Sequence, residues 1–291
     1  MIATTLFGGL GNQMFIYATV RAISLKNKVG MAFNISQGFN DDKLFFRNLE
    51  LSKFNLVIPE SNISTFNIPM GKRIRAISRK LGFNLLSPKY KFIKEERPYH
   101  FQKSLLYQKL PNVYLEGYWQ SPYYFEEYSN IIKNDFNIKI NIRKEVQDEL
   151  SLIKSLSDNI VMIGVRRYQE CSSTKLIPGG KLTDINYYIK AMDLIRSKIN
   201  KPVFIVFSQD QEWVRDNIPS GSNLYFVKPK DGENSAIEDL YLMQNCNHHI
   251  ISNSSYYWWG AWLGNNPNKI VVAPDNFINK DTLCSNWIKL F

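Results

Sequence analysis

The chain has 291 residues, of which 44% are hydrophobic and 21% charged, and its formal net charge is +10 at pH 7. This composition is typical of a soluble globular protein, and it excludes a disordered chain, a collagen and a membrane bundle. No stretch approaches the roughly 20 apolar residues of a membrane span, and residues 1–10 lack the pattern of a signal peptide. We therefore expect a cytoplasmic protein that begins near Met1.

The first half opens as an α/β unit. The pattern predicts a strand over residues 1–7, a tight loop over Gly8–Gln13, a helix over 14–26 and a strand over 29–33. The loop, GGLGNQ, offers backbone N–H groups to an anion, although it has neither the dinucleotide nor the P-loop fingerprint. It has no ionisable side chain, so it would bind and orient a ligand, or simply join strand to helix.

A basic block covers Lys72–Lys109, with eleven basic residues against Glu95 and Glu96. Residues 71–83 have the pattern of a short basic amphipathic helix. The block is interpreted as a solvated face or as a docking surface for anionic lipid or an acidic substrate. Nucleic acid is a third interpretation, disfavoured because few aromatic residues lie between the basic ones, so we expect no nucleic-acid partner.

The second half alternates apolar β-branched runs with helical patterns, which predicts a parallel, doubly wound sheet. Ser235 and Glu238 form a predicted capping box. A boundary near residues 137–142 gives two lobes, 1–140, which carries the basic insertion, and 141–291. The predicted strands are 160–165, 203–207, 224–227, 249–251 and 270–273, and the predicted helices are 186–198, 211–217, 236–244 and 255–264.

Cysteines and histidines argue against cross-links and metals. The three cysteines stand alone without C-x-x-C spacing, and only His248 and His249 are adjacent among the three histidines. We expect no disulfide framework and no bound metal. The two histidines alternate on a predicted strand, so a core or edge role is favoured for both.

Polar residues follow several predicted strands, at the sheet edge where α/β proteins bind ligands. Arg166 and Arg167 end the first strand of the second half and could grip a diphosphate, or form a surface pair with Glu170 or Asp184. Asp210 follows the next strand and would bind a guanine or ribose, or cap the following helix.

Two further segments lie around a later strand of the second half. Asn253-Ser254-Ser255 closes that strand and could hold phosphate oxygens. The aromatic run 256–262 is expected to pack on the sheet rather than to stack on a sugar, because its spacing is helical.

Several segments together resemble the α-1,2-fucosyltransferases of glycosyltransferase family 11, in order along nearly the whole chain outside the basic middle. They are GGLGNQMFIYA (8–18), LEGYWQSPYYF (115–125), GVRR (164–167), FSQDQEWV (207–214), the block 238–263, KIVVAP (269–274) and NWIKL (286–290). The resemblance implies an α/β, GT-B-like fold with two Rossmann-like lobes and the donor site on the C-terminal lobe. It also implies inverting, metal-independent transfer of L-fucose from GDP-fucose to the 2-hydroxyl of a galactose-terminated oligosaccharide, with no cofactor.

By the same resemblance, Arg166 matches the arginine expected at the β-phosphate, Arg167 its neighbour, and Asp210 an acidic residue expected at the guanine. The remaining matches belong to turns expected around the donor. They are Asn253, Ser254 and Ser255 along the diphosphate, and Gly9, Gly11, Asn12 and Gln13 in the loop that closes over donor and acceptor.

The chain also departs from the family pattern. The family has H-x-R-R-G-D-Y where this chain has Gly164 through Glu170, and NSSFSWW where this chain has Tyr256 and Tyr257. Loss of the histidine removes a donor-site hydrogen bond, which leaves open another GDP-sugar as donor. A non-catalytic protein that binds a nucleotide or glycan also stays open, because the sequence offers several candidates for the general base.

The general base is assigned to Glu170, with Asp41, Asp42 and Asp184 as alternatives. The basic block further suggests peripheral contact with the inner face of the membrane, where a lipid-linked acceptor would lie.

Overall fold

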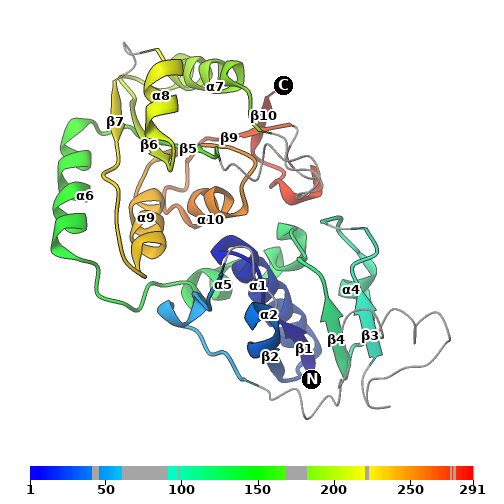
Figure 1. The fold of residues 1–291 in the computed structure, drawn as a ribbon. Coiled ribbons are helices and arrows are strands. Elements are labelled where there is room, and N and C mark those ends of the chain that lie inside the picture. Colours follow the sequence, from blue (N-terminus) through cyan, green and yellow to red (C-terminus); the bar gives the residue numbers. More distant parts are fainter. Residues whose placement is uncertain are drawn as a thin grey trace. The chain divides into compact units, whose positions relative to one another are not determined.

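The computed structural model describes residues 1–40, 46–60, 91–97, 99–167, 182–219, 223–275, 277 and 280–290. The chain divides into two compact units, Met1–Asn137 and Ile138–Phe291. Each unit has its own parallel sheet with helices packed on it (Figure 1). Across the described ranges, no helix combines the length and apolar character needed to cross a bilayer.

The described part of the N-terminal unit contains a four-stranded parallel sheet in the order β2-β1-β4-β3. Its strands are β1 (Ile2–Thr5), β2 (Met31–Asn34), β3 (Lys91–Lys94) and β4 (Val113–Glu116), and its α-helices are α1 (Leu10–Asn27), α2 (Ser36–Asn40), α4 (Ser104–Tyr107) and α5 (Ser129–Asp135). Short 3-10 turns cover Leu51–Lys53, Pro122–Tyr124 and Glu126–Tyr128. Most of α1 is buried, as expected for the helix that follows a central strand.

The predicted loop over Gly8–Gln13 is wrong from Leu10 onward, because these residues are helical. The helix begins at Leu10, because Gly9 is extended at the N-cap and its carbonyl accepts from the N–H groups of Asn12 and Gln13. Gly11, Asn12 and Gln13 therefore lie in the first turn of α1 rather than in a loop.

The described residues of the C-terminal unit form a six-stranded parallel sheet in the order β10-β9-β8-β5-β6-β7. Its strands are β5 (Ile160–Val165), β6 (Val203–Ser208), β7 (Leu224–Phe226), β8 (His248–Ile251), β9 (Val271–Pro274) and β10 (Ile288–Leu290). Its α-helices are α6 (Lys144–Leu156), α7 (Ile185–Lys198), α8 (Gln211–Asn217), α9 (Ser235–Gln244) and α10 (Ser255–Leu263).

The predicted alternation of strands and helices in this unit is confirmed to within a residue or two at each end. The prediction omitted the helix α6 and the short edge strand β10. The capping box of Ser235 and Glu238 is wrong: Asn234 is the N-cap residue, and the Glu238 carboxylate accepts instead from the guanidinium of Arg143, at 2.6 Å from Nη2. An arginine outside the helix supplies a stronger, charged donor than a backbone N–H group.

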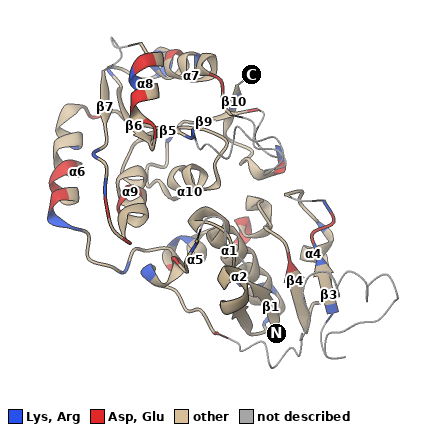
Figure 2. Ribbon diagram, in the orientation of Figure 1, with Lys and Arg blue, Asp and Glu red and all other residues tan. Residues whose placement is uncertain are grey.

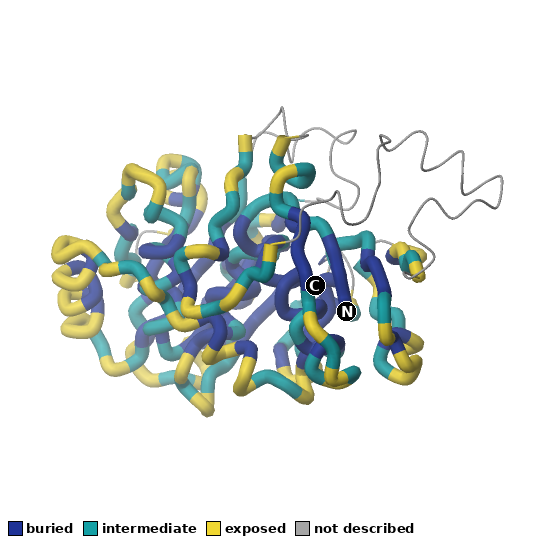
Figure 3. Tube along the Cα trace, turned by 90° about the horizontal axis from the view of Figure 1, so that it is seen from below, coloured by how far each residue is buried: buried dark blue, intermediate teal, exposed yellow. Residues whose placement is uncertain are grey.

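Charge and burial separate the outer helices from the sheet. Charged residues lie along α6, α7 and α8, whereas α10 carries none (Figure 2). Buried residues follow the inner strands of each unit, and exposed residues lie on outer helices and turns (Figure 3). The aromatic run 256–262 is confirmed as mainly core: Trp258 and Trp259 are fully buried, and Trp258 Nε1 donates to the Thr282 carbonyl.

Part of the basic block lies outside the described residues. This applies to residues 72–90 and with them to the predicted amphipathic helix. In the described remainder, Lys94 lies 3.6 Å from the Glu116 carboxylate and Lys91 donates to Gln108. The docking of an anionic surface stays a prediction.

Both histidines of β8 belong to the core, as favoured from the sequence. His248 Nδ1 accepts from the Ile270 N–H group, and His249 Nε2 lies 3.0 Å from the Met243 carbonyl, so the neutral His249 ring carries its proton on Nε2. Burial, helped by the charge of Lys269, lowers the pKa of His249 from 6.5 to about 3.

This lowered pKa predicts acid sensitivity. Unfolded His249 binds a proton near pH 6.5, whereas the folded residue does not. The contribution of His249 to the free energy of unfolding is therefore complete above pH 6.5 and falls by up to about 1.4 kcal/mol per pH unit below it. The His249→Gln variant keeps a donor for Met243, so its melting temperature should fall less between pH 7 and pH 4.5 than that of the wild type. The control is His100→Gln, at an exposed position, which should lose as much melting temperature as the wild type. An equal loss of melting temperature in the wild type and in His249→Gln would contradict the lowered pKa of His249.

Candidate functional site

The topology of the C-terminal sheet points to one edge. β5 leads to β6 and β7 on one side, and the chain then crosses to β8 on the other side of β5. Ligands of open parallel sheets bind at such a switch point, beyond the carboxyl ends of the two strands. Arg166 and Arg167 directly follow β5, and Asn253, Ser254 and Ser255 follow β8.

The two turns at this switch point are in contact. Arg166 Nη1 donates to the Asn253 carbonyl at 3.4 Å, so the guanidinium lies beside the start of α10. Asn253 and Ser254 are 6% and 5% exposed, and Ser254 is the N-cap residue of α10 without a side-chain capping bond. A guanidinium next to an uncharged helix N-terminus makes this edge favourable for an anion.

Arg167 is directed elsewhere. Its guanidinium lies 4.1 Å from the ring centroid of Trp213 in α8, a cation–π contact. Asp184, an ion-pair partner considered from the sequence, caps α7 by accepting from the Asn186 N–H group at 2.7 Å. Glu170, the predicted base, lies outside the described residues, as do Asp41 and Asp42.

Asp210 has the capping role that was one of its two predicted roles. Its Oδ1 accepts from the Trp213 N–H group at 3.0 Å at the start of α8, which follows β6. Since β6 neighbours β5, Asp210 stands one strand from Arg166 at the same edge. Binding of a guanine by this residue stays a prediction.

Sequence reasoning missed the role of Tyr257. Its hydroxyl donates to the Phe207 carbonyl at 3.1 Å, at the end of β6. Its ring lies over Gly164 so closely that a Cβ there would lie 2.4 Å from the ring Cγ. The signal was present in the sequence, because this chain departs from the family pattern at both positions, with Gly164 for a histidine and Tyr257 for a serine. In the structure, the Tyr257 ring occupies the space directly beside Gly164.

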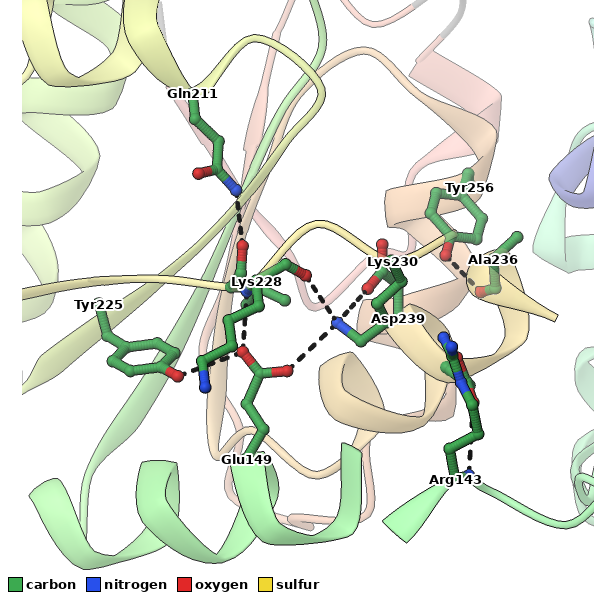
Figure 4. A network of polar contacts seen from close by, with 11 residues as sticks. Arg143, Glu149, Gln211, Tyr225, Lys228, Lys230, Ala236, Asp239 and Tyr256 are labelled. Atoms are coloured by element: carbon green, nitrogen blue, oxygen red, sulfur yellow. Dashed lines mark hydrogen bonds and ion pairs between the residues drawn. The ribbon is translucent and has the colours of Figure 1, made fainter. Parts of the chain in front are cut away.

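A buried ionic cluster, also missed, holds the segment between β7 and α9 (Figure 4). Lys230 Nζ lies 2.9 Å from Asp239 and 3.3 Å from Glu149, which also accepts from Lys228 N and the Tyr225 hydroxyl. Burial raises the pKa of Asp239, against the effect of Lys230. The cluster anchors this segment to α6.

The Gly8–Gln13 turn of the N-terminal unit follows β1. Gly8 has φ +78°, and a Cβ on Gly9 would lie 2.4 Å from Arg47 Nη1, so a guanidinium that the sequence did not single out lies against the glycines. Gln13 is fully buried and bonds to Gly8 O, Asn48 O and Glu50 N, so its side chain supports the turn from inside. Asn12 Oδ1 accepts from Gln120 at 2.8 Å.

No three His, Cys, Asp or Glu side chains within the described ranges are grouped as a metal site would require.

Comparisons with known proteins give one consistent family. The profile described as Glycosyl transferase family 11 matches residues 1–290. An alpha-1,2-colitosyltransferase of Escherichia coli is 30% identical, over 100% of this chain and 99% of that protein. The O-antigen biosynthesis glycosyltransferase WbnK of Escherichia coli is 29% identical, over 98% of this chain and 99% of its own length. Galactoside alpha-(1,2)-fucosyltransferase 1 of Bos taurus is 27% identical over 63% of this chain and 51% of its own length.

Among solved structures, FUT1 of Arabidopsis thaliana in complex with GDP matches with a TM-score of 0.52 and 11% identity, over 93% of this chain and 69% of that one. The expected α/β, GT-B-like fold is confirmed.

The contact of Gly164 with Tyr257 predicts a coupled pair. Gly164→Ala should destabilise the protein by about 1–3 kcal/mol, because the added methyl group overlaps the ring. In a Tyr257→Ser background, the same change should cost much less. A double-mutant cycle from urea unfolding measures the difference, and additive effects would contradict the contact.

Proposed function

We propose that the protein transfers L-fucose from GDP-fucose to the 2-hydroxyl of a galactoside, with inversion and without a metal. The proposal starts from the family: the chain belongs to glycosyl transferase family 11 and is therefore a glycosyltransferase. The observation that carries the proposal is the contact of Arg166 with the turn after β8 at the switch point of the C-terminal sheet. That edge suits a diphosphate by charge and by its N–H groups.

The reaction needs a stabilised leaving group. The acceptor oxygen forms a bond to the anomeric carbon as the bond from that carbon to the β-phosphate oxygen breaks, the acceptor proton passes to a base, and GDP departs. Arg166 and the N–H groups of residues 253–255 would stabilise the charge that develops on the diphosphate. Arg167, held on Trp213, would shape the strand end, and Asp210 would accept hydrogen bonds from the guanine.

The remaining roles are proposed from where the residues stand in the sequence. Gly9, Gly11 and Asn12 would bind substrate through the first turn of α1, with Gln13 as its internal support. Glu170 would take the acceptor proton. Peripheral membrane contact and a lipid-linked acceptor remain proposals that rest on the basic block Lys72–Lys109.

Loss of leaving-group stabilisation gives a direct test. Arg166→Ala should lower kcat about 100-fold or more with GDP-fucose, as removal of one charge-stabilising donor does in other enzymes. Arg196→Ala is the matched control, because Arg196 pairs with Asp193 in the last turn of α7, where the helix leads to the amino end of β6. Unchanged turnover in Arg166→Ala would overturn the proposed role.

A donor comparison tests the sugar. The similarity to an alpha-1,2-colitosyltransferase favours one specific alternative, a donor that carries colitose in place of fucose. We expect GDP-fucose to give the highest kcat/KM among GDP-fucose, GDP-colitose, GDP-mannose and UDP-galactose with a β-galactoside acceptor. Preference for GDP-colitose would keep the nucleotide site and reject fucose. Preference for UDP-galactose would reject both.

A further inference from the structure

We propose that Phe7, Tyr99 and Tyr118 form an aromatic platform on which a pyranose ring of the acceptor stacks. This proposal rests on the proposed function for the identity of the acceptor. It concerns the described residues of the N-terminal unit only, and it assigns a binding role to three side chains for which the sequence predicted none.

The platform lies at the switch point of its own sheet. β1 leads to β2 on one side, and the chain later places β4 on the other side of β1. Phe7 follows β1, Tyr118 follows β4, and Tyr99 follows β3, so all three lie beyond the carboxyl ends of parallel strands. This is the position at which such sheets bind ligands.

The three rings form one continuous cluster. The Phe7 and Tyr118 centroids are 4.8 Å apart with the rings at 63°, and those of Tyr99 and Tyr118 are 5.3 Å apart at 27°. Each of the three residues is partly exposed, in contrast to the fully buried aromatic core of α10. Large aromatic side chains in contact with each other at a partly open sheet edge present a flat apolar surface, which suits a ligand with an apolar face.

A buried carboxylate fixes the two tyrosines. Glu95, 5% exposed, accepts from the N–H groups of Tyr99, Tyr118 and Trp119 at 3.0–3.1 Å. A Cβ on Gly117 would lie 2.6 Å from the Glu95 Cβ, so the glycine is needed for this close approach. Glu95 is thus a positioning residue that sets the two loops against each other.

The backbone around the platform is strained. Tyr99 has φ +69° and Trp119 has φ +55°, in the left-handed region that bulky residues rarely occupy. Such strain is stored mainly at functional sites, where the surrounding bonds compensate for it. Here the compensation comes from the Glu95 carboxylate.

Hydrogen bonding is incomplete in the two residues that follow Tyr118. Trp119 Nε1 and Gln120 Oε1 are buried and have no hydrogen-bond partner among the described residues, although buried polar atoms are nearly always paired. Gln120 also donates to Asn12 in the first turn of α1. A ligand with one apolar face and several hydroxyl groups matches this edge, and a neutral hexopyranose such as a β-galactoside has that chemistry.

The test uses the full chain and methyl β-D-galactopyranoside as the probe, by saturation-transfer NMR without donor. We expect saturation of the probe by the wild type and by Tyr118→Phe, and its loss in Tyr118→Leu and Tyr99→Leu, which remove the flat ring but keep apolar volume. The acceptor KM should rise about tenfold in both leucine variants, with GDP affinity within twofold of the wild type. Tyr107→Leu, 73% exposed in the same unit, is the control.

Each outcome decides the proposal. No saturation of the probe by the wild type, or equal saturation by well-folded leucine variants, overturns the platform. If Tyr118→Leu has a much lower melting temperature than the wild type, the saturation of the probe by Tyr99→Leu decides the proposal. If saturation is lost as expected while GDP fails to bind the wild type, the platform stands and the proposed function fails. If GDP binds and transfer occurs with unaltered KM in the variants, the platform fails alone.

Discussion

The parallel crossover at β5 is the constraint on which the account of the C-terminal unit depends. Because β8 pairs with β5 on the side opposite β6, the turns that follow β5 and β8 must meet at one edge. The Arg166 guanidinium and the Asn253 carbonyl are in contact there. The uncharged α10, whose aromatic side chains fill the core, then begins at that contact with its N–H groups directed towards the edge.

The two sheets repeat this geometry with different side chains. At the β5–β8 switch point the chain places a guanidinium and a helix N-terminus, which suit an anion. At the β1–β4 switch point it places aromatic rings held by a buried carboxylate, which suit an uncharged ring. A transferase of nucleotide-activated sugars has to bind ligands of both kinds.

Much of this organisation could be predicted from the sequence, since strand and helix patterns in the second half are long and regular. The family resemblance is confirmed, and the core role of the β8 histidines followed from alternation. The missed features depend on contacts between distant residues: Arg143 takes Glu238 away from the capping box, Lys230 meets Glu149, and Tyr257 covers Gly164. The early start of α1 depended on the extended conformation of Gly9, which composition alone does not fix.

A crystal structure of the chain with GDP tests the central claim most directly. The account predicts the diphosphate beside the Arg166 guanidinium and the N–H groups of residues 253–255, with the guanine towards Asp210. A diphosphate bound away from the carboxyl ends of β5 and β8 would contradict it.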